Sequence, residues 1–569
     1  MAQLTNFRLA PASVMEESVA LIWDKSEQTV NVTEYVIYTE ELREEVLIDK
    51  NYSTEKALEG TGKTEALVLK IEKNAEATDN VPTGDVFRCQ CTDATIENLK
   101  SDTKYQFLLQ AVDDQGNVCM EAGPITIRTK KQGAVCNILD YGAMPVGTAS
   151  QMATSREAAG QDADNTAAQT AKGRSLNTEN RMATSAIQRA IDACPRGGRV
   201  VIPAGTFVTG ALFLKSEMTL YLEEGAVLLG SDDPTDYPLM EYRWEGREKL
   251  CYASLLNSKN MENGERLTDI TIAGKGVINA NGTILKEKEL AENKGARGRA
   301  ICIRNADRVY LKDITVRQSP AWCVHPIYCK DVTMNHISVH TKFDEAGNRY
   351  DVFNGDGIDP DSCQNVTIIH SLIASQDDCI AVKSGRDEDG RKVGIPTENV
   401  RITNCTFLSG FGVAMGSEMS GGIRNVLVQD CTFHNVYSIG SVKTPRGRGS
   451  IVENVLYDNC TLVNESTEHH DCRWFRGAIY IDQFYSHDQI DPLTMELVNE
   501  GTPIIRNITF HNCKARTIAG NAVFIAGLPE SPLQDIVLQN VEAEGLESCK
   551  IYNAGNIRLE NVKFFAHNL

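Results

Sequence analysis

The chain has 569 residues, more than one hydrophobic core normally serves, so we expect several domains or one elongated repeat. Its 42% apolar and 24% charged residues are typical of a soluble globular protein, and no apolar run approaches the roughly 20 residues of a membrane span. The 57 basic and 77 acidic residues give a net charge of −20, which disfavours nucleic-acid binding.

The chain begins MAQLTNFRLA, which contains neither the basic start nor the apolar stretch of a secretory signal. We therefore expect a cytoplasmic protein, or a secreted one if a leader has been removed. The 17 cysteines are scattered without a CxxC pair, so neither a zinc ribbon nor a full disulfide framework is expected. Most of them are interpreted as reduced, buried thiols.

Residues 1–130 alternate apolar runs such as SVALIW, EYVIYT, YQFLLQAV and ITIRT with polar turns, which predicts a small β-sandwich. Trp23 and the segment LKSDTKYQFLLQAV resemble the buried tryptophan and the tyrosine corner of fibronectin type III domains, with Tyr105 as the corner residue. An unrelated sandwich is the alternative. Residues 40–90 are interpreted as an insertion and 129–133 as a polar linker.

A mobile loop and a helix are predicted next. Residues 148–176 are rich in Ala, Thr, Gln and Ser without hydrophobic periodicity. Asn177 can cap a helix whose apolar face comprises Ala183, Ile187, Ala190, Ile191 and Cys194. That helix is expected to cover the open end of the following domain, where strand edges would otherwise be unpaired.

Short β-rich segments recur from residue 200 onward, each with a polar residue in front of an alternating apolar pattern. The second residues of these segments are Val332, Val366, Val400, Val426, Val455, Ile508, Ile536 and Ile557. The steps between them are 34, 34, 26, 29, 53, 28 and 21 residues, and the step of 53 is interpreted as two coils. Steps of this length favour coils of a parallel β-helix over propeller blades, so residues 134–569 are predicted to form one solenoid.

A cysteine follows the repeat mark at a constant offset in several coils, at Cys405, Cys431, Cys460 and Cys513. These thiols are expected to stack inside the solenoid. A metal ladder is the alternative, but ligands at one strand spacing would form a row and not a tetrahedron.

Two acidic clusters, NGDGIDPD and QDDC, lie on successive repeats. Acidic residues beside glycine often only form turns, but the register favours a shared site. Asp356 and Asp377 are 21 residues apart, about one coil, so their carboxylates can face the same groove. Counting from the repeat marks places Phe411 of the next coil over Asp377, or Gly410 if the register slides by one residue.

Three carboxylates crowded in one cleft, those of Asp356, Asp377 and Asp378, repel one another, which raises the pKa of at least one and leaves another ionised. Hydrolysis of a glycosidic bond requires that division into acid and base. An inverting enzyme separates the two groups by about 6.5–9.5 Å and a retaining one by about 5–5.5 Å, and sequence spacing leaves both open.

An ordered set of segments carries a family resemblance: DYGA (140–143), PAGTFVTGALFLKSEMTLYLEEGAVLLGSDDPTDYP (203–238), SPAWCVHPIYC (319–329), NGDGIDPDS (354–362), DDCIAVKSG (377–385), GVAMGSEMSGG (412–422) and VKTPRGRG (442–449). With them, residues 134 to about 490 resemble glycoside hydrolase family 28, the polygalacturonases, and its bacterial exo-acting branch. The resemblance implies an all-β protein, a right-handed parallel β-helix that hydrolyses α-1,4-galacturonosyl bonds with inversion and without a metal or other cofactor.

By position, the resemblance implies that Asp377 is the general acid and that Asp356 and Asp378 together activate the water. Asn354 would orient that water or the sugar, and Lys443 would bind a galacturonate carboxylate. Other residues are implied to line the pocket, Tyr485 on the leaving-group side and Trp322, His325, Lys383, Glu418, Arg446 and Arg448 elsewhere. The alternative for these is a solvated charge or a packed aromatic ring.

Two positions depart from the family pattern. Its Gly-His-Gly is Gly-Phe-Gly here, with Phe411 at the centre, and its Arg-Ile-Lys begins with Ser441. The second change removes a bidentate carboxylate partner that lysine does not replace. Both lie toward the leaving-group side. From the carboxylate set and the N-terminal domain we expect an exo-acting galacturonosidase. A leaving sugar without a carboxylate, such as rhamnose, would explain both departures, so cleavage of galacturonate from rhamnose is one alternative. A non-catalytic β-helix that binds acidic glycans is the other.

Residues 438–452 contain Lys443, Arg446 and Arg448 and no acidic residue. This composition predicts a local basic patch for a small acidic sugar within an acidic protein. The expected partner is a pectic oligosaccharide, and the sequence leaves the oligomeric state open.

Overall fold

The computed structural model describes residues 2–25, 32–42, 85–146, 182–259, 265–344, 346–466, 468, 475–485 and 489–567. The chain forms two compact units, residues 1–9 with 14–131 and residues 10–13 with 132–569. Most of the predicted insertion, the predicted loop 148–176 and Asn177 lie outside the described residues. Within the described ranges, no helix is long and apolar enough to cross a membrane.

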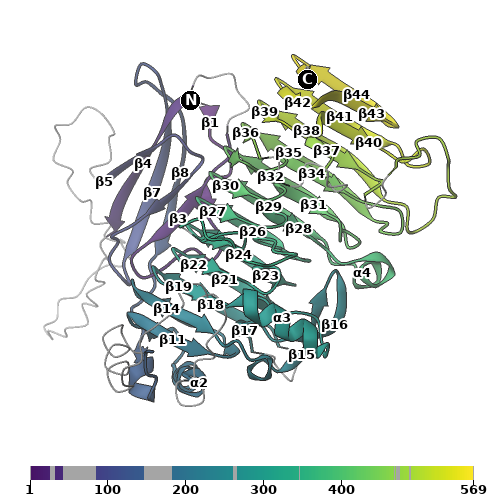
Figure 1. Cartoon of the computed structure of the whole chain (residues 1–569). Helices are drawn as coiled ribbons and strands as arrows, with labels where there is room; N and C mark the ends of the chain where they lie inside the picture. The colour runs from purple at the N-terminus through teal and green to yellow at the C-terminus, as the bar shows by residue number, and fades with distance from the viewer. Residues whose placement is uncertain are drawn as a thin grey trace, which may run out of the picture. The chain divides into compact units, whose positions relative to one another are not determined.

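The first unit consists of two sheets (Figure 1). One has the order β1 (Ala2–Gln3), β8 (Val118–Arg128), β7 (Lys104–Asp113), β4 (Val32–Leu42), β5 (Asp85–Cys89), and the other contains β2 (Arg8–Leu9), β3 (Val19–Ile22) and β6 (Asp93–Ile96). Strands pair antiparallel except β1 with β8, which confirms the predicted sandwich. Trp23 is fully buried, and the Tyr105 hydroxyl accepts a hydrogen bond from the Lys100 backbone N–H at 2.8 Å, as in a tyrosine corner. Kinship with fibronectin type III domains stays a prediction.

The second unit is a parallel β-helix with three long faces (Figure 1). The first face is β9 (Val135–Asn137), β10 (Gly198–Ile202), β13 (Met218–Leu222), β18 (Leu267–Gly274), β21 (Ala306–Lys312), β24 (Lys330–Asn335), β26 (Gln364–Ile369), β29 (Thr397–Thr403), β32 (Ile423–Gln429), β35 (Ile451–Asp458), β38 (Ile504–His511), β41 (Leu533–Gln539) and β44 (Ala554–Glu560). The second is β11 (Gly205–Thr209), β14 (Ala226–Gly230), β19 (Val277–Asn279), β22 (Thr315–Arg317), β25 (Ser338–His340), β27 (Leu372–Ala374), β30 (Thr406–Ser409), β33 (Thr432–His434), β36 (Thr461–Asn464), β39 (Lys514–Thr517), β42 (Glu542–Gly545) and β45 (Lys563–Ala566).

The third face consists of two sheets. One is β12 (Leu212–Leu214), β17 (Leu256–Ser258), β20 (Ile301–Arg304) and β23 (Val324–Ile327), and the other is β28 (Ile380–Val382), β31 (Val413–Gly416), β34 (Gly440–Lys443), β37 (Gly477–Asp482), β40 (Asn521–Ala526) and β43 (Glu547–Tyr552). Between the coils lie the hairpin β15 (Leu239–Trp244) and β16 (Arg247–Tyr252), with η1 (Ile138–Tyr141), α2 (Thr184–Ala193), η2 (Pro234–Asp236), α3 (Gly282–Glu292) and α4 (Asp387–Val393).

The repeat marks pair in register along the first face, from Val332 with Val366 through Ile536 with Ile557, as predicted. The polar residue before each mark has φ between 54° and 58°, a left-handed conformation that Asn and Asp tolerate. These side chains also bond along the stack, since Asn425 Nδ2 donates to Asn399 Oδ1 at 3.1 Å. The asparagine of the pattern therefore supplies both the turn and a link between coils.

The step of 53 residues contains one coil, so its interpretation as two coils is wrong. Val455 of β35 pairs directly with Ile508 of β38. The extra length lies in residues 465–476 and 483–503, the connections before and after β37. Stacking constrains the strands of a coil but not the length of its surface loops.

The interior of the solenoid confirms two further predictions. Cys405, Cys431, Cys460 and Cys513 are buried within the core, and none of the four forms a disulfide. The helix α2 buries the predicted face, comprising Ala183, Ile187, Ala190, Ile191 and Cys194, against the first coils. It begins at Thr184, with Ala183 in the N-cap position.

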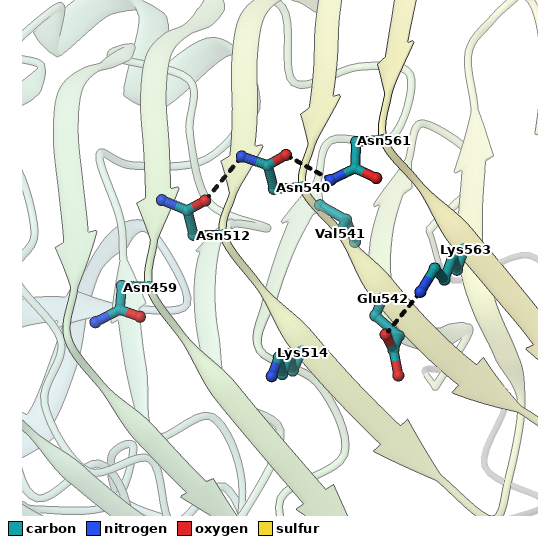
Figure 2. A pocket seen from close by; sticks show the side chains of 8 residues that line it. All are labelled: Asn459, Asn512, Lys514, Asn540, Val541, Glu542, Asn561 and Lys563. Carbon is teal, nitrogen blue, oxygen red and sulfur yellow. Dashed lines mark hydrogen bonds and ion pairs between the residues drawn. The ribbon is translucent and has the colours of Figure 1, made fainter. Parts of the chain in front are cut away.

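A polar groove follows the turn between the first and second faces of the last coils (Figure 2). It is lined by Asn459, Asn512, Lys514, Asn540, Val541, Glu542, Asn561 and Lys563. Asparagines bond along it, from Asn540 Nδ2 to Asn512 Oδ1 at 3.0 Å and from Asn561 Nδ2 to Asn540 Oδ1 at 2.9 Å. The acidic clusters border the third face instead.

Candidate active site

The candidate site lies on the outer side of the third face. Residues 356–361 form isolated bridges to β23 and β28 and so join the two sheets of that face. Because Ile380 belongs to the core, the alternate positions of the strand face outward. Ala381, Ala414 and Ser441 pair across successive coils at such positions. Their small side chains leave room above this part of the sheet.

The coil register brings the three predicted catalytic carboxylates together. Ile358 pairs with Ile380, so Asp356 stands beside Asp378 on successive coils, with Asp377 as the adjacent residue. The predicted spacing of 21 residues set Asp356 against Asp377, and the observed register is one residue longer, so the clusters meet as predicted but Asp378 is the direct neighbour of Asp356.

The next coil is offset by one residue from the count that placed Phe411 over Asp377. Ile380 pairs with Val413, which sets Gly410 beside Asp377. Glycine is required there, because its φ is 105° and a Cβ would lie 2.3 Å from the Asp377 carbonyl oxygen. The alternative register, with Gly410, is the observed one.

A buried lysine is surrounded by three carboxylates. Lys383 Nζ lies 3.4 Å from Asp356 Oδ2, 3.5 Å from Asp359 Oδ1 and 3.2 Å from Glu418 Oε2. Burial alone would raise the pKa of Glu418, but Lys383 and Arg448 lower it to about 2. Glu418 is therefore an anion that anchors Lys383 beside Asp356.

A second lysine pairs with the second catalytic carboxylate. Lys443 Nζ lies 2.6 Å from Asp378 Oδ2 and 5.3 Å from the centre of the Tyr485 ring. Lys443 is buried, and it balances the negative charge of Asp378.

Among the residues that the structure describes, no cation pairs directly with the remaining carboxylate, Asp377. Burial, followed by the charges of Asp356 and Asp378, raises its pKa from 3.8 to about 8. Burial and the charge of Asp359 likewise raise the pKa of Asp356 well above its ordinary value, although Lys383 opposes the shift. Asp377 is thus protonated at neutral pH and partly exposed, as a proton donor must be.

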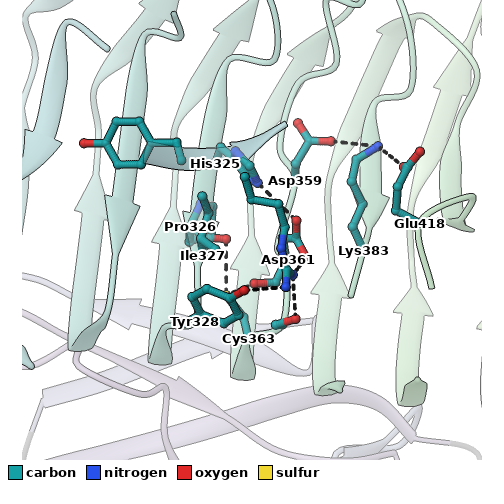
Figure 3. A network of polar contacts seen from close by, with 12 residues as sticks. His325, Pro326, Ile327, Tyr328, Asp359, Asp361, Cys363, Lys383 and Glu418 are labelled. Carbon is teal, nitrogen blue, oxygen red and sulfur yellow. Dashed lines mark hydrogen bonds and ion pairs between the residues drawn. The ribbon is translucent and has the colours of Figure 1, made fainter. Parts of the chain in front are cut away.

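A buried ionic network supports these groups from the preceding coil (Figure 3). Arg243 Nη1 donates to Asp361 Oδ1 at 2.6 Å and to Ser362 Oγ at 2.9 Å, and His325 Nε2 lies 3.5 Å from Asp361 Oδ2. Burial would raise the pKa of Asp361, but Arg243 and His325 lower it to about 2, whereas burial lowers the pKa of His325 to about 3. His325 is therefore a buried neutral imidazole at the pH where Asp377 acts.

This network was only partly foreseeable. Asp359 and Asp361 belong to the acidic cluster noted in the sequence, but the sequence predicts no role for either residue. Arg243 comes from the hairpin β15–β16, more than a hundred residues earlier in the chain, and no local motif marks it. Arg243 meets its partner Asp361 only in the folded chain, where the hairpin packs against the third face.

Aromatic rings form the wall beside the network. Trp322 stacks on Trp244 with ring centres 5.2 Å apart and meets His325 edge to face at 5.0 Å. Lys383 Nζ lies 4.6 Å from the centre of the Trp322 ring. The predicted pocket residue Trp322 therefore contacts both His325 and Lys383.

The two arginines of the predicted basic patch are paired with acids from distant parts of the chain. Arg446 forms a two-bond contact with Glu530, at 2.6 and 2.9 Å, and Arg448 Nη1 lies 2.5 Å from Asp387 Oδ1. Arg448 Nε also donates to the Ser417 carbonyl oxygen at 2.7 Å. The patch that is basic in sequence is thus neutralised in the fold, because other segments contribute the acidic partners.

Comparison with known proteins decides the family. The model of glycosyl hydrolases family 28 matches residues 240–561, more than half of the chain. The chain belongs to glycosyl hydrolases family 28. An exo-poly-alpha-D-galacturonosidase of Dickeya chrysanthemi is 29% identical over 465 residues, which cover 73% of this chain and 67% of that protein. A probable polygalacturonase of Vitis vinifera is 30% identical over 385 residues, covering 65% and 71%.

Solved structures agree on the fold. The family 28 exopolygalacturonase of Yersinia enterocolitica has a TM-score of 0.70 at 20% identity, covering 99% of this chain and 96% of that one. The exopolygalacturonase of Thermotoga maritima has a TM-score of 0.58 at 24% identity, covering 77% and 93%. The likeness confirms the predicted fold class, a right-handed parallel β-helix.

Two positions distinguish this family 28 chain on the side of Lys443. Phe411 packs with Tyr437 at 4.9 Å between ring centres, and Tyr437 with Phe475 at 5.1 Å, so an apolar cluster stands where the family resemblance implies a histidine. Ser441 is fully buried at the place of the family's arginine. Lys443 therefore carries the positive charge of that motif without its neighbour.

Proposed function

We propose that this chain is an exo-acting galacturonosidase, which hydrolyses α-galacturonosyl linkages in pectin-derived oligosaccharides with inversion. The proposal is supported by membership of glycosyl hydrolases family 28 and by relatives named exo-poly-alpha-D-galacturonosidase and polygalacturonase. The observation that carries it is a cluster of three adjacent carboxyl groups, in which the pKa of Asp377 is raised to about 8 while Asp356 and Asp378 contact the buried lysines Lys383 and Lys443.

Asp377 acts as the general acid. Its carboxyl group is protonated at neutral pH and partly exposed, so it can donate its proton to the glycosidic oxygen as the bond to the leaving sugar breaks. A protonated leaving group departs as a neutral alcohol, which lowers the barrier to cleavage.

Asp378 acts as the base toward the attacking water. Its carboxylate is held at 2.6 Å by Lys443, and Asp356 stands beside it. The water oxygen bonds to the anomeric carbon from the face opposite the leaving group while the carboxylate takes the water's proton. Asp356, held by Lys383, accepts a second hydrogen bond from that water or from a sugar hydroxyl. The product is one sugar with inverted anomeric configuration, and the proton count balances because Asp377 gives one proton and Asp378 gains one.

The test is product analysis on two series of substrates, oligogalacturonides and rhamnogalacturonan oligosaccharides, by mass spectrometry and by NMR of the first-formed anomer. We expect single galacturonate units with inverted configuration from the oligogalacturonides, and none with Asp377→Asn. Release of galacturonate from the rhamnose-linked series alone would replace the proposed substrate. An unsaturated product would indicate elimination, and binding without turnover, unaffected by Asp377→Asn, would indicate a glycan-binding protein.

A further inference from the structure

The proposed substrate is an acid, yet the cations already described around the site are occupied. Lys383, Lys443, Arg243, Arg446 and Arg448 each contact at least one carboxylate of the protein itself. A sugar carboxylate that bound to one of them would have to compete with a protein carboxylate. A cation without such a partner is better suited to bind it.

Arg297 is a buried cation of this kind. Arg297 is only 4% exposed. In the part of the chain that the structure describes, it forms no ion pair with a carboxylate. Nη1 donates to the carbonyl oxygens of Pro320 and Phe353 at 3.0 and 2.7 Å, and Nη2 donates to Asn354 Oδ1 at 2.5 Å. The guanidinium carbon lies 3.8 Å from the centre of the Phe353 ring and 5.2 Å from that of Trp244.

The hydrogen bonds of Arg297 leave donors unused. A guanidinium has five N–H groups, and the described contacts use three of them. Asn354 is fixed by the same contact, because its oxygen accepts from Arg297 and its NH2 group is left as a donor. Asn354 is partly exposed and lies two residues before Asp356. Arg297 and Asn354 thus offer N–H donors next to the catalytic carboxylates.

We propose that Arg297, with the NH2 group of Asn354, binds the carboxylate of the galacturonate on the non-reducing side of the scissile bond. The side follows from the coil order. Lys443, on the leaving-group side in the family pattern, belongs to β34, whereas Arg297 directly precedes β20, and Asp377 lies between these two coils. This inference rests on the proposed function.

The energetic balance agrees with a binding role. A buried guanidinium without a counter-charge is costly, and burial lowers the pKa of Arg297 to about 10 although Glu289 and Glu245 oppose the shift. An incoming carboxylate would supply the missing negative charge and accept the unused N–H bonds. A neutral sugar in the same place would leave them unmade.

The experiment measures affinity by calorimetry in the Asp377→Asn background, where the ligand is not consumed. The two probes are trigalacturonate and the same trisaccharide with galactose at its non-reducing end. We expect trigalacturonate to bind about 10- to 150-fold more tightly, the value of a hydrogen bond to a charged group. Adding Arg297→Gln should reduce that ratio to below about threefold, and Arg297→Lys should retain part of it.

The control is Arg299→Gln. Arg299 is 1% exposed and also forms no ion pair with a carboxylate in the described residues, but its Nη2 donates to the Arg243 carbonyl oxygen, and it does not contact Asn354. This variant also loses a buried arginine and should keep the ratio. Since the ratio compares two ligands on one protein, a partly unfolded fraction does not change it.

A ratio that survives both Arg297 variants would overturn the inference and leave the proposed function intact. If the two probes bind with nearly equal affinity when Arg297 is intact, that result would also overturn the inference and leave the proposed function intact. Failure of the unsubstituted protein to hydrolyse oligogalacturonides, together with failure of Asp377→Asn to bind either probe, would overturn the proposed function and this inference together.

Discussion

Activity should fall at alkaline pH as Asp377 loses its proton. Its pKa of about 8, against 3.8 for an ordinary aspartate, corresponds to about 5 to 6 kcal/mol in favour of the protonated form. Because the general acid must carry its proton, kcat/KM should be constant below pH 7, halve near pH 8 and fall to about one tenth near pH 9. The assay is the initial rate of reducing-sugar release at low substrate concentration between pH 5 and pH 10.

The variant Lys443→Met tests how neighbouring charges set the pKa of Asp377. Lys443 lowers the pKa of Asp377, so its removal should shift the alkaline limb upward by about 1 pH unit. The rate at neutral pH should fall by about 10- to 100-fold, because Asp378 loses the cation at 2.6 Å. Arg446→Met is the matched control, since Arg446 pairs with Glu530 and should leave the limb in place.

Two outcomes would refute this reasoning. An alkaline limb near pH 5 would mean that Asp377 is ionised at neutral pH and does not donate the proton. A limb that moved downward in Lys443→Met would mean that the interaction of Lys443 with Asp377 has the opposite sign.

Glu289→Gln should remove a pH dependence of stability. Burial raises the pKa of Glu289 from 4.5 to about 8. Between these two pH values the folded state keeps a proton that the unfolded chain releases. The free energy of unfolding of the unsubstituted protein therefore falls by about 1.4 kcal/mol per pH unit in that range. Urea unfolding at pH 5 and pH 8 measures the difference, and equal slopes for both proteins would contradict it. Asp361→Asn should cost about 3–5 kcal/mol in the same assay, because Arg243 stays buried without its counter-ion, and a loss below 1 kcal/mol would show that the pair is not buried in solution. Tyr105→Phe should cost about 1 kcal/mol in the unfolding of the first unit, because the Lys100 N–H loses its acceptor, and an unchanged transition would exclude the tyrosine corner.

The repeat and the adjacency of the catalytic carboxylates were determined by the sequence alone. In a parallel stack, each residue lies beside the equivalent residue of the next coil, so spacing along the chain converts directly into neighbours in space. That is why the repeat marks from Val332 to Ile557 pair in register, although Val455 and Ile508 were expected to lie two coils apart, and why the clusters of Asp356 and Asp378 meet. The same rule erred by one residue at Phe411, because the offset between these coils is 34 residues on the first face, at Val366 and Val400, but 33 on the third face, at Ile380 and Val413.

The charges of the site were decided only by the tertiary structure. Lys443, Arg446 and Arg448 lie in a stretch of sequence without acidic residues, but Glu530 and Asp387, from distant parts of the chain, pair with the two arginines. Loop lengths follow no repeat, so the partner of a loop residue cannot be counted along the chain. Net charge and local composition therefore describe the long-range field, whereas the free cation for an acidic sugar is a property of the folded site.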